Sequence, residues 1–538
     1  MPEQNAVAYI DARMLAQRLA TRDAWALIDV RDPGAYERGH IFGATSVPRQ
    51  RLEQRIGTLV RDLRTPIVLC DDGNGRAERA AITLTRHGYR GVAVLSGGVD
   101  AIAGTELRTV SGTNVPSKLF GEEVLHQYDI PAIAADTLAS WRAAGRDVVL
   151  CDVRTPEEHA MSCVPGALGA PSFVIALGMA DLAAAHETIV VTCAGRTRSI
   201  IGALTLRELG HVNVVILENG LMGWRLAGRA IEEGTLRTVA APTTASIASA
   251  LQASRRLADE AGVTRMDVPT LRTLLDDRGR DGYVFDVRPV RDHVASHIPG
   301  TIALPGGQAI QRTDDFVAIR GAPVVLVDEH GVEANLTGTW LRRMGIANVA
   351  VLDGGIGAWR EADGRLVEGR AREAPLGWDD AIRSIRVESP PACERRRLEG
   401  DIVVLDVDSS RHYRVGHVPG ARWTPRGDLE MIIEGVVPSR ATPVLITCAT
   451  GVHSVYAAAA LQDAGYRDVT VLRGGTREWH QQGLPLEHAD LPPQDDELLP
   501  PYQRGLEAMR DYIDWEKLLL GAGARGAGSG TARKERRP

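Results

Sequence analysis

Apolar residues along this chain occur in short runs that alternate between two kinds of spacing. Between residues 135 and 217, DTLASWRAAG and RSIIGALTLRELG have the spacing of helices with one buried face. DVVLCDV, TIVVTC and NVVIL are continuous apolar runs, which are typical of buried strands. Strands that alternate with helices predict an α/β fold, a parallel sheet with helices on both faces. In such sheets ligands bind at the carboxyl ends of the strands.

This pattern occurs four times. Two blocks mark each copy, and the first block appears as LIDVRDPGAYERGHIFGA, LCDVRTPEEHAMSCVPGA, VFDVRPVRDHVASHIPGT and LDVDSSRHYRVGHVPGA. The second block ends at Gly98, Gly220, Gly355 and Gly475, with spacings of 122, 135 and 120 residues. The first aspartates of the other block, Asp29, Asp152, Asp286 and Asp406, are spaced by 123, 134 and 120 residues. Periods of this length indicate whole domains rather than the turns of a solenoid.

The predicted domains span residues 7–104, 126–232, 263–364 and 386–488, and are called copies one to four below. Residues 489–538 are predicted to contain a linker, a helix and a basic tail, which we expect to be solvated and disordered. A further helix is expected in the junction between copies two and three. Because this junction gives the longest spacing, we expect two pairs in chain order, one and two, then three and four.

Candidate chemistry lies in the loop that follows the TIVVTC-type apolar run of each copy. Copy two reads Cys193-Ala-Gly-Arg-Thr-Arg198-Ser199, and copy four reads Cys448-Ala-Thr-Gly-Val-His453-Ser454. In copies one and three, Asp71 and Asp328 stand at the cysteine position. Backbone N–H groups converge in such a loop, and the following helix adds partial positive charge. A thiol there is expected to lower its pKa from about 8.5 toward about 3.5–7.5 and to act as a nucleophile.

The predicted catalytic residues are therefore the two cysteines, Cys193 and Cys448. Arg196 and Arg198 are expected to attract an anionic substrate. The predicted substrate-binding residues are the remaining residues of the two loops: Ala194, Gly195, Arg196, Thr197, Arg198, Ser199, Ala449, Thr450, Gly451, Val452, His453 and Ser454.

These motifs resemble the rhodanese family. The family's DVR-to-GHIPGA block, its Cys-x4-Arg loop and its ending with Gly-Gly and Trp correspond to Asp152–Ala167, Cys193–Arg198 and Val214–Trp224. The resemblance implies a thiosulfate sulfurtransferase, in which a small-molecule donor leaves sulfur on cysteine and cyanide, a thiol or a partner protein accepts it. It implies no metal and no organic cofactor.

Departures from the family pattern separate the copies. Asp71 and Asp328 cannot carry a persulfide, so copies one and three are predicted to be inactive, and copies two and four active. Copy three adds Glu329 and Glu333, and copy four has His453 in place of arginine. Copy one lacks the tryptophan that the other copies have at 224, 359 and 479.

The remaining four cysteines are given lesser roles. Cys163, at a position where the other copies have histidine, is interpreted as a packing substitution, with a resolving thiol as the alternative. Cys151 is predicted to lie in the core, and Cys70 and Cys393 are expected to take no part in the reaction.

Two other functions compete with sulfur transfer. Phosphatases and arsenate reductases of the same fold resemble this site, but their loop is Cys-x5-Arg, one residue longer. A binding or regulatory protein is the other alternative, because two copies lack the cysteine. The complete loop of copy two favours an enzyme.

The composition indicates which partners and which cellular compartment to expect. The 538 residues carry a net charge of −7, which argues against nucleic acid as a partner. No apolar run has the length of a membrane span, and the N-terminus does not read as a secretory signal. The six cysteines form neither a CxxC pair nor a zinc-type cluster, so we expect a cytoplasmic protein without a metal.

Overall fold

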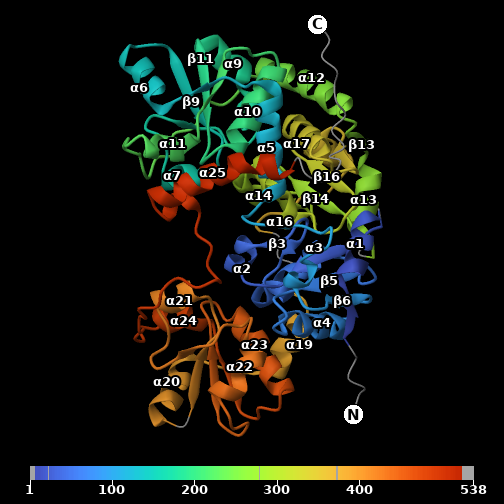
Figure 1. Cartoon of the computed structure of the whole chain (residues 1–538), viewed down its shortest axis with the longest axis vertical. Helices are drawn as coiled ribbons and strands as arrows, with labels where there is room; N and C mark the ends of the chain where they lie inside the picture. Colours follow the sequence, from blue (N-terminus) through green and yellow to red (C-terminus); the bar gives the residue numbers. More distant parts are fainter. Residues whose placement is uncertain (1–6, 22, 278, 371–373, 401, 524–538) are drawn as a thin grey trace. The chain divides into compact units, whose positions relative to one another are not determined.

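The computed structural model describes residues 7–21, 23–277, 279–370, 374–400 and 402–523. Within these residues there are four five-stranded sheets, in which all neighbouring strands are parallel. A short antiparallel pair, β3 (His40–Ile41) and β7 (Thr109–Val110), accompanies the first sheet. The predicted α/β fold with four repeats is confirmed (Figure 1).

Copy one has the strand order β1-β6-β5-β2-β4. Its central strands are buried apolar runs. The sheet strands are β1 (Ala8–Ile10), β2 (Ala26–Asp29), β4 (Thr45–Ser46), β5 (Ile67–Cys70) and β6 (Val92–Leu95). The helices are α1 (Ala12–Ala20), α2 (Pro33–Arg38), η1 (Arg49–Arg51), α3 (Leu52–Leu59), α4 (Arg76–Arg86) and η2 (Val99–Ile102).

Copy two repeats this order as β8-β12-β11-β9-β10. Its strands are β8 (Ala132–Ile133), β9 (Val148–Asp152), β10 (Leu168–Gly169), β11 (Thr188–Thr192) and β12 (Val214–Leu217). Its helices are α6 (Ala135–Ala143), α7 (Pro156–Met161), α8 (Val174–Leu177), α9 (Met179–Ala185), α10 (Thr197–Glu208) and α11 (Gly220–Leu226), and α5 (Val115–Tyr128) precedes the repeat.

Copy three has the order β13-β17-β16-β14-β15. The helix expected before it is present as α12 (Thr244–Glu260). The strands are β13 (Thr264–Met266), β14 (Tyr283–Asp286), β15 (Ile302–Ala303), β16 (Val324–Val327) and β17 (Val349–Leu352). The other helices are α13 (Val268–Asp276), α14 (Val290–Ala295), α15 (Gly306–Gln311), α16 (Thr313–Phe316), α17 (Val332–Arg343) and α18 (Gly355–Glu361).

Copy four has the order β18-β22-β21-β19-β20. The strands are β18 (Arg386–Glu388), β19 (Val403–Asp406), β20 (Arg422–Trp423), β21 (Val444–Thr447) and β22 (Val469–Leu472). The helices are α19 (Trp378–Ser384), α20 (Pro390–Glu399), α21 (Ser410–Val415), α22 (Leu429–Val436), α23 (Val452–Asp463) and α24 (Gly475–Gln481).

The chain continues into η3 (Pro501–Gln503) and α25 (Leu506–Gly523), the helix expected near the C-terminus. Met509 and Ile513 of α25 are buried against Met222 of α11. Figure 1 shows α25 lying beside α5 and α11. The basic tail predicted to be disordered lies outside the described residues. Of the helices in the described part of the chain, none combines the length and the apolar character that a membrane span requires.

The glycine that marks the second block of each copy has a structural reason to be glycine. Gly98, Gly220, Gly355 and Gly475 all have positive φ values, between 55° and 66°. A Cβ at each of them would overlap the backbone carbonyl oxygen of one residue, namely Asp71, Cys193, Asp328 and Cys448, respectively. These four residues therefore occupy equivalent places in the four copies, as the sequence alignment predicted.

The copies associate differently from the pairs expected in chain order. The chain forms two compact units, one containing copies one and four, the other copies two and three together with residues 499–523. The expected pairing of one with two and of three with four was wrong. Each unit nevertheless combines one copy with an aspartate loop and one with a cysteine loop.

Contacts between distant segments explain this pairing. Copies one and four share a buried network in which Glu53 accepts hydrogen bonds from Arg49 at 2.8 Å and from Arg426 at 3.2 Å. Copies two and three are joined by Trp340, whose Nε1 donates to Thr205 Oγ1 at 2.8 Å. These contacts span long stretches of chain, so the spacing between copies carried no information about them.

Candidate functional site

Cys193 lies in the loop between β11 and α10, at the carboxyl end of the central strand of its sheet. It is 2% exposed, and its Sγ donates a hydrogen bond to Ser199 Oγ at 3.4 Å. Ser199 Oγ donates in turn to the carbonyl of Arg196 at 2.8 Å. The start of α11 holds the loop from the other side, because the N–H of Leu221 donates to the carbonyl of Cys193 at 2.9 Å. The loop is therefore fixed at both its ends and its centre.

The two arginines of this loop are paired with carboxylates. Arg196 binds Glu122 of α5 through two hydrogen bonds of 2.5 and 2.7 Å, and also Asn219 at 2.8 Å. Arg198 binds both carboxylate oxygens of Glu158 at 2.7 Å. Burial alone would raise the pKa of Glu158, but the charge of Arg198 outweighs this effect and lowers the pKa to about 2. The positive charges expected to meet an anionic substrate are thus largely offset by these partners.

The C-terminal helix covers the same loop. A Cβ at Gly195 would lie 2.7 Å from Met222 Cε, 3.6 Å from Glu516 Oε2 and 3.8 Å from Tyr512 Cε1. Glu516 is fully buried, and its Oε1 lies 3.3 Å from Nζ of Lys118. A side chain at position 195 would touch α25 at ordinary contact distance and would require the end of Met222, on α11, to shift.

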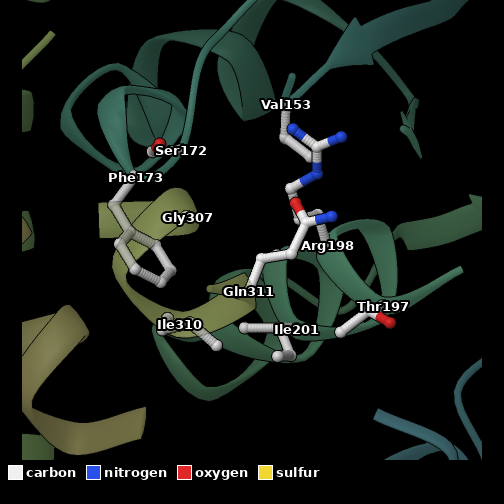
Figure 2. Close-up of a pocket in the computed structure, with 10 residues that line it drawn as sticks. Val153, Ser172, Phe173, Thr197, Arg198, Ile201, Gly307, Ile310 and Gln311 are labelled. Carbon is white, nitrogen blue, oxygen red and sulfur yellow. The ribbon is translucent and has the colours of Figure 1, made fainter. Parts of the chain in front are cut away.

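The copy-three helix α15 packs beside α10 and lines a narrow pocket next to Arg198 (Figure 2). Figure 2 shows Phe173 on one side of this pocket, with Arg198 and Gln311 on the other. Thr197, at the start of α10, also lines it. A copy with an aspartate loop therefore contributes residues next to the Cys193 loop.

Cys448 occupies the equivalent loop of copy four, between β21 and α23. It is fully buried, and its Sγ accepts a hydrogen bond from the N–H of Gly451 at 3.1 Å. The Sγ also lies 3.2 Å from Ser454 Oγ. These contacts are those expected of a backbone cradle around sulfur. Thr450 and Val452 lie in the same loop, at the start of α23.

The electrostatics of this second loop differ from the expectation. Burial, and then the negative charge of Asp408, raise the pKa of Cys448 to about 11. Asp408 Oδ2 accepts a hydrogen bond from the N–H of Ala449 at 2.7 Å. Burial lowers the pKa of His453, whose Nδ1 lies 3.5 Å from Gln54 Nε2 of copy one. The expected lowering of the thiol pKa is therefore wrong for Cys448.

In the other two copies an aspartate fills the loop with its own carboxylate. Asp71 accepts hydrogen bonds from the N–H groups of Gly73 and Ala77 at 2.8 and 2.9 Å. Asp328 accepts three, from the N–H groups of Gly331, Glu333 and Ala334, at 2.7, 2.9 and 3.2 Å. The loop thus binds an anion in both aspartate copies, and that anion is part of the protein.

The other four cysteines are free and buried. Cys163 exchanges backbone hydrogen bonds with Glu232 at 2.7 and 2.9 Å, and burial raises its pKa to about 11. Burial likewise raises the pKa of Cys151, in β9, to about 12. Cys70 and Cys393 belong to core clusters. These surroundings favour packing roles.

Several residues that shape the loops were missed by sequence reasoning. Glu158 stands at the acidic position of the DVR block, so its place in the motif was a usable signal. Glu122 and Glu516 lie outside the repeats, on α5 and α25, and no sequence motif marks them. Asp408 replaces the arginine of the DVR block, a departure visible in the sequence whose meaning appears only in the contact with Ala449.

The fold and the loop geometry define a class of α/β proteins in which a strand-to-helix loop presents cysteine. The rhodanese-like domain profile matches residues 11–105, 134–227, 267–362 and 389–482. The crystal structure of a thiosulfate sulfurtransferase from Pseudomonas aeruginosa superimposes with a TM-score of 0.88 and 34% identity, covering 96% of this chain and 98% of that one. The chain belongs to the rhodanese family.

Two curated relatives are similar over parts of the chain. "Putative thiosulfate sulfurtransferase SseB" of Mycobacterium tuberculosis is 37% identical over 131 residues, which are 24% of this chain and 43% of that protein. The chain thus matches less than half the length of this relative. The 3-mercaptopyruvate sulfurtransferase of Escherichia coli K12 is 25% identical over 229 residues, 38% of this chain and 80% of that protein.

Proposed function

We propose that this rhodanese-family protein is a sulfurtransferase that carries sulfur as a persulfide on Cys193 and on Cys448. One observation carries the proposal. In copies one and three the loop N–H groups bind a carboxylate, so the same loop in copies two and four is built to hold an anion. In these two copies the residue at the loop entrance is a thiol, whose reacting form and persulfide are both anions.

The reaction with thiosulfate would proceed in two steps. The thiolate of Cys193 attacks the outer sulfur of the donor, a sulfur–sulfur bond forms, and sulfite leaves with the electron pair of the broken bond. Cyanide or a thiolate then attacks the outer persulfide sulfur, and Cys193 leaves as thiolate. The loop N–H groups and the start of α10 stabilise the negative charge on sulfur at both stages.

Copies one and three, residues 7–104 and 263–364, are assigned a supporting role. Their loops lack a thiol, and their aspartates already occupy the N–H groups that a donor would need. They contribute residues beside the cysteine loops instead, Gln54 near His453 and Gln311 near Arg198.

The test is the mass of the intact full-length protein after incubation with thiosulfate or 3-mercaptopyruvate. We expect added sulfur that a reductant removes, located by peptide mapping at Cys193 and Cys448. Cys193→Ser should lose the sulfur at position 193 and keep it at 448, and Cys448→Ser should do the reverse, because a hydroxyl is a far weaker nucleophile. Unchanged mass in the wild-type protein with both donors would refute the proposal.

A further inference from the structure

Arg154 of copy two is a buried cation with one unused group of donors. It is 1% exposed. Its Nε and Nη2 bind the carboxylate of Asp152 at 3.0 and 2.6 Å, and its Nη2 also donates to the carbonyl of Ser162 at 2.5 Å. Its Nη1 is buried and has no hydrogen-bond partner among the residues that the structure describes. Buried donors of a charged group are rarely left without a partner, so this atom needs an explanation.

The equivalent arginines in the aspartate copies have the same anchors, and an acid lies near Nη1, hydrogen-bonded in copy one and at ion-pair distance in copy three. In copy one, Nη2 of Arg31 binds Asp29 at 2.7 Å and the carbonyl of Gly39 at 2.6 Å, and Nη1 binds Asp72 at 2.9 Å. In copy three, Nη1 of Arg288 lies 3.6 Å from Glu329 Oε2. Each of these acids directly follows the aspartate at the nucleophile position. In both aspartate copies the protein itself supplies the anion for this guanidinium.

Copy two has Ala194 at the position of these acids, directly after Cys193. The guanidinium is held by the same anchors, so its Nη1 is placed toward the start of the cysteine loop. Among the described residues no carboxylate bonds to this atom: the charge of Glu158 acts on Arg154, but Arg198 binds both oxygens of Glu158. Copy four shows that a side chain at the position of Arg154 reaches the residue directly after the cysteine. There Asp408 replaces the arginine and accepts a hydrogen bond from the N–H of Ala449. Within the described loops, copy two alone combines a thiol with an unpaired cationic donor.

We propose that Arg154 is the group that binds the anionic part of the sulfur donor at Cys193. This proposal rests on the sulfurtransferase function proposed above and assigns it a donor-binding residue. An N–H of Nη1 donates to an oxygen of the donor, a sulfonate oxygen of thiosulfate or a carboxylate oxygen of a mercapto acid. When Cys193 attacks the outer sulfur of thiosulfate, the electron pair of the broken sulfur–sulfur bond passes to sulfite, and this contact stabilises the charge on its oxygens.

The first test uses Arg154→Lys in the full-length chain that also carries Cys448→Ser. Lysine keeps a positive charge beside Asp152 but has no fork to reach the donor as well. We expect the rate of persulfide formation from thiosulfate at Cys193 to fall about tenfold or more. A donor without a sulfonate or carboxylate group, the hydrodisulfide of a neutral thiol, offers no oxygen to Nη1 and should react within about twofold of the parent rate. A merely structural arginine would slow both donors equally, and that outcome would overturn the proposal.

Arg288→Lys in the same background is the matched control. It breaks the same aspartate–arginine pairing in copy three, whose loop has no thiol, so both donor rates should stay unchanged. If Arg288→Lys selectively slowed the thiosulfate reaction as much as Arg154→Lys, the loss would come from packing and the assignment to Arg154 would be wrong.

The second test gives the Nη1 of Arg154 a carboxylate partner from the protein itself. Ala194→Asp gives copy two the acid that copy one has after its own aspartate, and it should reduce persulfide formation from thiosulfate far more than Ala194→Asn. Equal effects of the two variants would overturn the proposal. The proposed sulfurtransferase function is tested separately. It would be wrong only if the parent protein gained no sulfur at Cys193 from any donor.

Discussion

Glu53 of copy one and Arg426 of copy four form an ion pair of 3.2 Å, although 373 residues separate them in the chain. Glu53 also accepts from Arg49, and all three side chains are buried. Removing one partner of such a network leaves buried charge uncompensated. We expect Glu53→Ala to destabilise this unit by about 3–5 kcal/mol. Hydrogen exchange of peptides from α3 and α22, compared in full-length wild type and variant, measures the loss.

The control for this variant is Glu434→Ala. Glu434 pairs with Arg440 at 2.9 Å, and both side chains are exposed. Exposed pairs contribute about 0–1 kcal/mol, so exchange in the same peptides should hardly change. If both variants had the same small effect, the buried network would not be what holds copies one and four together.

The same network predicts an acid-sensitive stability. Burial alone would raise the pKa of Glu430, but the charges of Arg426 and Arg49 outweigh this effect and lower the pKa from 4.5 to about 2. A carboxyl whose pKa is lower in the folded protein stabilises the fold at pH values above its unfolded pKa. That contribution is lost as the pH falls from about 4.5 to about 2. The free energy of unfolding of this unit, measured with urea, should therefore fall less steeply over this pH range in Glu430→Gln than in wild type.

The fold could be predicted from the sequence because each copy repeats the same local pattern. Buried strands, the helices between them and the glycine after the last strand all depend on neighbouring residues. The pairing of copies could not be predicted in this way. It depends on single long-range contacts, such as Trp340 with Thr205 and Glu53 with Arg426, which have no periodicity in the sequence.

The candidate site, like the fold, was predictable only as far as local sequence patterns determine it. The alignment placed Cys193 and Cys448 at equivalent loop positions, and the structure agrees. It could not tell that Arg196 and Arg198 are held by Glu122 and Glu158, since one of these partners lies outside the repeat. A charge in a sequence does not reveal its partner, and the partner decides whether the charge is available to a ligand.

We predict that the two cysteines differ in donor preference. Cys193 has Arg154 near its loop, whereas Cys448 has Asp408 at the equivalent position. Thiosulfate should therefore favour Cys193, and the less charged 3-mercaptopyruvate should be used relatively better at Cys448. The assay compares Cys193→Ser and Cys448→Ser with both donors. Equal donor ratios in the two variants would contradict it.

His453 predicts a pH dependence for thiosulfate use at Cys448. Because burial lowers the pKa of His453 below its ordinary value, this side chain gains its charge at lower pH than a free histidine does. A rise in thiosulfate use at Cys448 through His453 should therefore have its midpoint at lower pH than an ordinary histidine would give. In Cys193→Ser, a profile with its midpoint at pH 6.5 or above would show that the pKa of His453 is not lowered or that another group is responsible.

The thiol of Cys448 itself gives the most direct check on the electrostatics of copy four. Burial and Asp408 raise its pKa to about 11, so little thiolate is present at neutral pH. Asp408→Asn removes the negative charge but keeps an oxygen that can accept from the N–H of Ala449, and the pKa of the thiol should fall. Alkylation of Cys448 by iodoacetamide, followed by peptide mass spectrometry, should then reach its half-maximal rate at lower pH in the variant. Asp463→Asn, at the exposed end of α23, is the matched control and should leave the profile unchanged. Identical profiles for Asp408→Asn and wild type would mean that burial alone sets the acidity of this thiol, and that Asp408 does not distinguish the two cysteine loops in charge.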